Sequence, residues 1–122
     1  MFTNTRAFSG FAVDDIAKAR TFYAETLGIK TSEENAILTL HLAGDRDTIV
    51  YPKPDFVPAT YTILNFAVDD IEKAVDELNG RGVQVVRYEG FEQDARGIFR
   101  GGGPLIAWFN DPAGNVLAVI QQ

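Results

Sequence analysis

The sequence predicts an α+β fold made of two similar modules, each ordered strand, helix and then three strands. The first observation is an internal repeat: residues 11–16, FAVDDI, return as residues 66–71, 55 positions later. The second is the alternation of side chains with a period of two ahead of each copy, and the third is apolar spacing near 3.6 residues after each copy. Together they indicate a duplicated strand–helix unit.

Each copy of the repeat predicts the passage from a strand into a helix. The Asp-Asp pair ends the strand and supplies an N-cap, because a short carboxylate can accept hydrogen bonds from the first helical turn. In the second copy, Asp69 and Glu72 have the spacing of a capping box. Gly28 follows the first apolar stripe, where a left-handed residue is needed to end a helix. The stripes are Ile16, Ala19, Phe22, Tyr23 and Leu27, then Ile71, Ala74, Val75 and Leu78.

The remaining segments complete the two modules with strands. Strands are expected at 30–34, 36–42 and 48–51 in the first module and at 84–88, 105–109 and 116–121 in the second. Residues 89–104 are rich in glycine and charge and predict a long loop. The first module spans about residues 5–53, a proline-containing linker about 54–60 and the second module about 61–122, within one domain of 122 residues.

Composition favours a compact, soluble protein. Hydrophobic residues make up 46% of the chain, and no apolar run is long enough to cross a membrane. The absence of cysteine excludes disulfides, thiolate metal sites and a cysteine nucleophile. The net charge of −6 argues against nucleic acid as a partner, since phosphate binding needs clustered Lys and Arg. The acidic surface either attracts a cationic small molecule or, as we favour, keeps the protein soluble. We expect a cytoplasmic protein without a membrane partner.

Four features together resemble the vicinal oxygen chelate superfamily, which includes glyoxalase I and the fosfomycin-resistance, bleomycin-resistance and extradiol dioxygenase proteins. They are the Val-Asp-Asp-Ile strand ends, Phe22-Tyr23 with Leu27-Gly28, Gly82-Val83, and the turn at residues 111–115, DPAGN. The features occur in the right order over nearly the whole chain. The resemblance implies a glyoxalase/bleomycin-resistance/dihydroxybiphenyl-dioxygenase-like fold, in which two βαβββ modules curl a mixed sheet around a cavity. It also implies a homodimer.

The same resemblance implies where a divalent metal is held in catalytic relatives. Two ligand positions lie seven residues before the second Asp of each pair, and here they are Phe8 and Ile63. A third lies seven residues after the Asp of the DPAGN turn, and here it is Ala118. None of these side chains offers a donor atom to a metal ion. We therefore expect no metal and no cofactor.

Two classes of function follow. The preferred one is metal-independent binding of a small hydrophobic or aromatic molecule such as a drug or natural product, as the resemblance to bleomycin-resistance proteins implies. The alternative is a glyoxalase-like lyase or isomerase that uses no metal or non-standard ligands and acts through His41 with a nearby acid. A domain that has lost its ligand is a third possibility. The candidate ligand-binding residues are Phe8, His41, Tyr51, Ile63, Asn65, Phe99, Arg100, Trp108 and Ala118.

The strand at 105–109 decides which aromatic side chain reaches the expected cavity. Successive side chains of a strand point to opposite faces, so either Trp108 or its neighbours Ala107 and Phe109 face inward. We expect Trp108 to do so, because the small Ala107 then lies beneath a helix, where space is limited. An indole on a cavity wall would stack on flat ligands.

Overall fold

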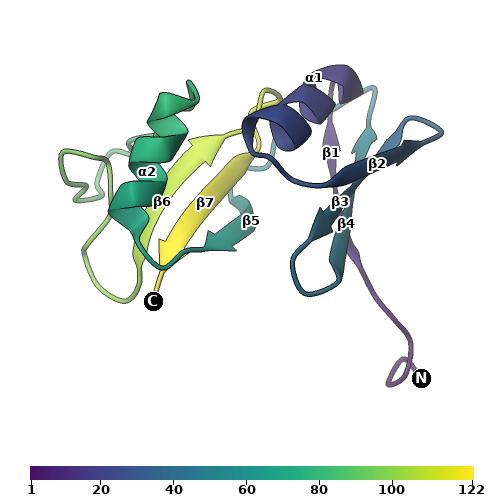
Figure 1. Cartoon of the computed structure of the whole chain (residues 1–122), viewed down its shortest axis with the longest axis horizontal. Coiled ribbons are helices and arrows are strands. Elements are labelled where there is room, and N and C mark those ends of the chain that lie inside the picture. Colours follow the sequence, from purple (N-terminus) through teal and green to yellow (C-terminus); the bar gives the residue numbers. More distant parts are fainter. The chain divides into compact units, whose positions relative to one another are not determined.

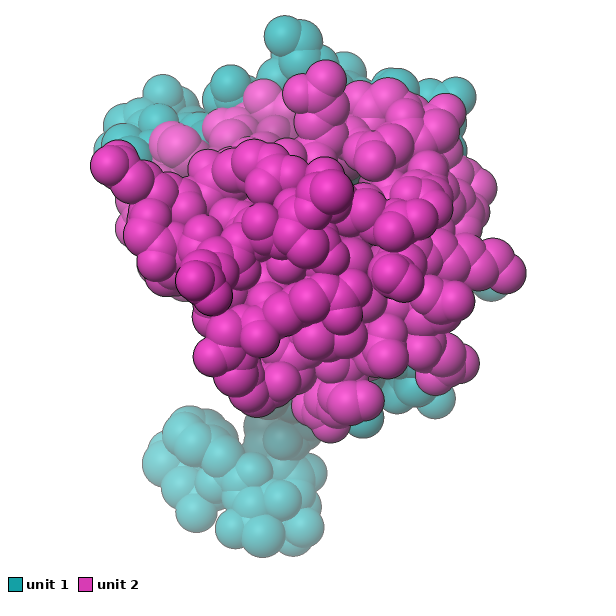
Figure 2. Space-filling model, turned by 90° about the vertical axis from the view of Figure 1, so that its left-hand side faces the viewer, with its two compact units in different colours: residues 1–57 teal, residues 58–122 magenta.

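The computed structural model describes all 122 residues as two compact units, residues 1–57 and 58–122 (Figure 2). Unit 1 contains β1 (Ser9–Val13), α1 (Ile16–Arg20), η1 (Thr21–Thr26), β2 (Thr31–Glu34), β3 (Ile37–Leu42) and β4 (Arg46–Pro52). Unit 2 contains β5 (Thr62–Ala67), α2 (Ile71–Gly80), β6 (Leu105–Asn110) and β7 (Val116–Gln121) (Figure 1). The predicted α+β class with two βαβββ-type modules is confirmed. No helix is long and apolar enough to span a membrane.

The repeated Asp pair caps a helix in both units. Asp15 accepts a hydrogen bond from the backbone N–H of Lys18, and Asp70 accepts one from the N–H of Lys73, each at 3.1 Å. Both aspartates have the extended backbone conformation of an N-cap residue, and the helix begins at the residue that follows each of them. The predicted capping box from Asp69 is wrong by one residue, because the N-cap is Asp70 and the helix begins directly after it.

The first helix departs from the single α-helix that the apolar spacing predicted. After α1 the chain continues as the π-helix η1, and the N–H of Leu27 reaches back five residues to the carbonyl of Phe22 at 2.9 Å. The wider turn allows the consecutive residues Phe22 and Tyr23 both to be buried. Gly28 then ends the helical segment with a positive φ of 71°, as expected.

In unit 1 the strands lie in the order β1-β4-β3-β2, with β1 parallel to β4 and the others antiparallel. One face of this sheet carries Leu38, Leu40 and Val50, all fully buried, and α1 packs on β3 and β4. The opposite face carries His41, Asp47 and Tyr51 and is partly exposed, since residues directly across the sheet share a face.

In unit 2 the strands lie in the order β5-β7-β6, with β5 parallel and β6 antiparallel to β7. Helix α2 packs on β6 and β7 (Figure 1). Its apolar side chains Ile71, Val75 and Leu78 are buried. Ala107 and Phe109 of β6 are buried as well, at 0% and 1% exposure. The unit therefore has one layer of helix over one three-stranded mixed sheet.

The strand predicted at 84–88 does not form, because side chains replace its ladder partners. Only Val86 pairs with β6, through a single bridge to Trp108 with an N–H···O distance of 2.8 Å. The amide of Gln93 accepts from the N–H of Tyr88 and donates to the carbonyl of Val86. Arg87 donates to two carbonyls of the following loop. These bonds satisfy the backbone groups of Val86 and the N–H of Tyr88 without a fourth strand.

The turn between β6 and β7 depends on one buried carboxylate. Asp111, which is 3% exposed, accepts from the backbone N–H groups of Ala113 and Asn115 and from the side-chain amide of Asn115. Asp111→Ala should lower the free energy of unfolding by about 2–4 kcal/mol, because several buried donors lose their acceptor. Urea unfolding followed by circular dichroism measures this loss. The exposed control Asp55→Ala should leave the midpoint nearly unchanged, and equal midpoints for both variants would contradict the role of Asp111.

Candidate functional site

Trp108 lies at one end of a row of three side chains that crosses the strands of unit 2. It is opposite Ala118 of β7, which in turn is opposite Asn65 of β5. Residues that are directly opposite share a face, so these three side chains lie on the face that does not carry Ala107 and Phe109. Trp108 is half-buried, Asn65 is exposed and Ala118 is fully buried.

Four aromatic rings cluster on this face. The centroid of Trp108 lies 5.5 Å from that of Tyr88, 5.4 Å from Phe91 and 5.9 Å from Phe99. Tyr88 and Phe91 meet nearly edge to face, with an interplanar angle of 74°. Such offset and edge contacts are the favoured geometry of aromatic pairs. The sequence predicted Trp108 and Phe99 as ligand-binding residues but not Tyr88 and Phe91. Tyr88 lies next to the loop at 89–104 and Phe91 lies within it, and this loop has no periodic pattern.

An open pocket of about 260 Å³ lies against this cluster. Its lining contains three aromatic side chains of the cluster, a further tyrosine (Tyr61) outside the cluster, two threonines and a valine. The lining residues are Thr60, Tyr61, Thr62, Tyr88, Phe91, Trp108 and Val116. None of them carries a formal charge at neutral pH, and burial raises the pKa of the Tyr88 phenol above its ordinary value, so that group stays neutral. The pocket is thus a neutral aromatic surface with hydroxyl groups.

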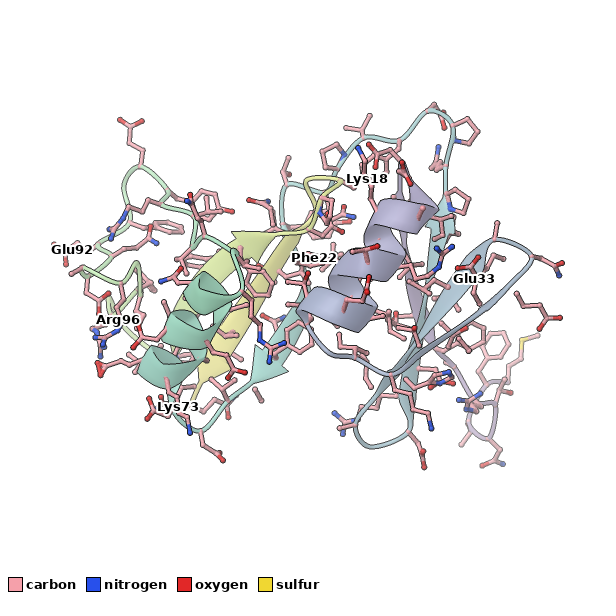
Figure 3. All side chains as sticks on the ribbon, turned by 45° about the horizontal axis from the view of Figure 1, so that its top comes forward. Lys18, Phe22, Glu33, Lys73, Glu92 and Arg96 are labelled. Atoms are coloured by element: carbon pink, nitrogen blue, oxygen red, sulfur yellow. The ribbon has the colours of Figure 1, made fainter.

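The loop that carries Phe91 and Phe99 is tied back to the rest of unit 2 by polar contacts. Arg96 makes a two-pronged hydrogen bond to Asp76 of α2, at 3.0 and 3.2 Å, and lies beside that helix in Figure 3. Asp94 accepts from the N–H groups of Arg96 and Ile98. Desolvation opposes the ionisation of Asp94, but bonds from Arg100 and the backbone outweigh it and lower its pKa. These contacts position the aromatic rings of the loop.

Arg100 does not belong to the aromatic pocket. Its Nε donates to Asp94 at 2.9 Å, and its Nη2 lies 3.6 Å from Glu72 of α2. It lines a different, polar pocket of unit 2 together with the start of α2. Ala118 is fully buried, and Ile63, at the irregular pairing of β5 with β7, is half-buried. Neither lines the aromatic pocket. Of the predicted ligand-binding residues, Trp108 lines the aromatic pocket, and Phe99 contacts the Trp108 ring without lining the pocket.

Three predicted residues lie in unit 1. Phe8 precedes β1 and is 60% exposed, and Tyr51 lies near the end of β4 at 37% exposure. Tyr51 and His41 share the open face of the sheet. No hydrogen bond or ring stacking joins Phe8, Tyr51 and His41.

His41 instead bridges two other side chains on that face. Its Nε2 lies 2.8 Å from the hydroxyl oxygen of Ser32 on β2, and its Nδ1 lies 3.1 Å from a carboxylate oxygen of Asp47 on β4. The sequence reasoning found no acid at a fixed spacing from His41 and missed both partners. The signal was the hairpin turn after His41, since its register places Asp47 directly opposite the imidazole.

The residues do not fit the divalent metal that catalytic relatives hold. Phe8, Ile63 and Ala118 provide no donor atom, and no group of three or more His, Cys, Asp or Glu side chains is placed to hold a metal ion. His41 and Asp47 are two donors that already bond to each other.

Comparison with known proteins gives one family and many similar folds. The Glyoxalase family model, described as the Glyoxalase/Bleomycin resistance protein/Dioxygenase superfamily, matches residues 7–119. No curated protein matches the chain. Among solved structures, TnmS3, an antibiotic binding protein from Streptomyces sp. CB03234, is 25% identical with a TM-score of 0.68, and the match covers 98% of each chain.

Two further solved structures show the same fold. A glyoxalase family protein from Enterococcus faecalis is 23% identical with a TM-score of 0.70, and the match covers 98% of this chain and 99% of that one. A putative glyoxalase family protein from Bacillus anthracis is 19% identical with a TM-score of 0.71, with coverage of 100% and 99%.

Proposed function

Because the chain belongs to the Glyoxalase/Bleomycin resistance protein/Dioxygenase superfamily, we propose that it is a metal-independent binding protein for a flat hydrophobic or aromatic small molecule. The observation that carries this proposal is the open pocket of unit 2, whose walls include Trp108, Tyr88 and Phe91. Ligand pockets in proteins are mostly apolar and aromatic, with a few polar groups that fix orientation. Here Thr60 and Thr62 supply such groups.

The chemistry of the pocket narrows the ligand. The walls carry no charged side chain, so nothing in the lining would pair with an ionised ligand group. A volume of about 260 Å³ is small for a ligand site, which favours a one- or two-ring aromatic group in the pocket and any larger remainder outside it. Rings of Trp108 and Phe91 offer π faces for stacking, and threonine hydroxyls can bond to carbonyl or hydroxyl groups at the ligand edge.

Two further observations support binding rather than metal-assisted catalysis. The positions that hold the metal in catalytic relatives carry Phe8, Ile63 and Ala118, so the chain lacks the donors for a Lewis acid there. One structural neighbour, TnmS3, is an antibiotic binding protein. We accordingly propose that the ligand is a planar natural product or drug. Homodimer formation and a cytoplasmic location remain predictions.

A fluorescence screen of planar aromatic compounds tests this function. The chain contains one tryptophan, so its emission reports on Trp108 alone when tyrosine is not excited. A ring that stacks on the indole should change the intensity or wavelength of that emission saturably. If no planar compound binds with a dissociation constant below roughly 1 mM, the binding function is wrong.

A further inference from the structure

We propose that Ser32, His41 and Asp47 of unit 1 form a nucleophilic site that cleaves small esters through an acyl group on the Ser32 hydroxyl oxygen. This activity is independent of the ligand pocket in unit 2. A nucleophile, a base that touches it and a third group that orients the base are the arrangement by which serine nucleophiles are recognised. The order of contacts here is hydroxyl, imidazole, carboxylate.

The two distances assign the roles. An ionised carboxylate only accepts hydrogen bonds, so Asp47 at 3.1 Å from Nδ1 holds a ring proton on Nδ1. The other nitrogen, Nε2, then has a free lone pair 2.8 Å from the Ser32 hydroxyl, which is within reach for proton transfer. His41 is the general base, and Asp47 holds its tautomer and orientation.

The sheet fixes these side chains relative to one another. Asp47 is directly opposite His41 in the β3–β4 ladder, and Ser32 is opposite Thr39, which is two residues from His41 on the same face. Groups on paired strands keep their spacing better than groups on loops. Arg6 lies 3.6 Å from the second carboxylate oxygen of Asp47. The base and its orienting group are therefore placed by the backbone register.

The edge of the sheet supplies a donor for the charge that develops during acyl transfer. The N–H of His41 donates to the carbonyl of Lys30 at 2.8 Å, and hydrogen-bonded pairs alternate along an antiparallel ladder. Lys30 and His41 form one hydrogen-bonded pair, so the next such pair is Ser32 with Thr39. The residue between pairs, Glu33, then has its backbone N–H directed away from β3. Strand β2 ends this sheet (Figure 3 labels Glu33 on it). The N–H of the residue after the nucleophile is a backbone donor suited to an oxyanion.

Exposure and charge define the substrate class. Ser32 is exposed, and His41 and Asp47 are 35% and 31% exposed, so a small ester can reach the hydroxyl. Glu34 lies on the same face of β2 as Ser32, and Asp47 of β4 is paired with Arg6. The local charge is therefore mixed, and we expect esters of small neutral acyl groups to react.

The reaction needs no metal or redox partner. The Ser32 oxygen forms a bond to the ester carbonyl carbon as its proton passes to His41 Nε2. The bond from that carbon to the leaving oxygen then breaks, and His41 returns the proton to the leaving alcohol. Water next attacks the acyl group and gives a proton to His41. The bond to the Ser32 oxygen breaks, the hydroxyl is restored and the carboxylic acid leaves.

Hydrolysis of p-nitrophenyl acetate by the full chain, with labelling by a fluorophosphonate probe, tests the proposal. We expect the probe to attach to Ser32, as shown by peptide mass mapping. We also expect Ser32→Ala and His41→Gln each to lower the esterase rate by about 100-fold. The matched control is Ser9→Ala. Ser9 is the other serine of the chain, and its hydroxyl bonds to Thr48 rather than to a histidine, so this variant should keep the rate.

A second variant separates activation from folding. The chain has no cysteine, so Ser32→Cys introduces a single thiol whose alkylation by iodoacetamide can be timed. His41 should promote the thiolate, and adding His41→Gln should slow alkylation by about tenfold or more. The proposal is overturned if the wild-type serine is not labelled, if Ser32→Ala hydrolyses the ester like wild type, or if His41→Gln leaves the alkylation rate unchanged.

Discussion

Trp108→Ala is expected to weaken binding of a planar aromatic ligand by about 10- to 100-fold, which corresponds to the loss of one stacking contact. The reason is that the indole lies at the centre of the aromatic cluster, within 6 Å of three other rings, and lines the pocket. Isothermal titration calorimetry measures the loss, because the variant has no tryptophan emission. Trp108→Phe keeps a flat ring and should lose less affinity.

The control for this prediction is an aromatic side chain of unit 1, which does not line the pocket. Phe2 is 71% exposed, and no ring contact of this residue is present in unit 1, so Phe2→Ala should bind the ligand as wild type does. If wild type and Trp108→Ala bind the ligand equally well, the indole only contributes to packing and the ligand lies elsewhere.

Phe109→Ala is expected to lower the free energy of unfolding by about 3–5 kcal/mol, the range for deleting a buried aromatic ring. Phe109 is 1% exposed and stacks against Phe66 with ring centroids 6.5 Å apart. Its neighbour Trp108 points to the other face and is only half-buried, so Trp108→Ala should cost clearly less. The two adjacent variants therefore separate stability from ligand binding.

Urea unfolding followed by far-ultraviolet circular dichroism measures both variants under the same conditions. A larger loss of stability for Trp108→Ala than for Phe109→Ala would show that the two faces of β6 have been assigned in reverse. It would also remove Trp108 from the pocket wall.

Much of the fold could be predicted because it depends on local patterns. The repeated FAVDDI segment marks two strand–helix junctions, and its aspartates form real N-caps. Alternation along 105–109 separates Ala107 and Phe109 from Trp108, and the burial of the first two agrees with that separation. Such features lie within a few residues of one another, so the sequence shows them directly.

The parts that could not be predicted depend on contacts between distant segments. Tyr88 and Phe91 reach the pocket because Gln93, Asp94 and Arg96 hold an irregular loop, and no periodicity encodes that conformation. The same side-chain bonds remove the strand expected at 84–88. Likewise, Ser32 and Asp47 meet His41 only through the pairing of three strands. The sequence shows no acid at a fixed spacing from His41, because the partner is set by strand register.

A nuclear magnetic resonance titration tests the aromatic pocket most directly. The chain has one indole N–H, so Trp108 gives one side-chain signal in a ¹⁵N–¹H spectrum. With a planar compound from the fluorescence screen, we predict a saturable shift of that signal. Backbone signals of residues 60–62, 88–91 and 116 should shift with the same dissociation constant. Saturable shifts confined to other segments, with the indole signal unmoved, would contradict a ligand site at Trp108.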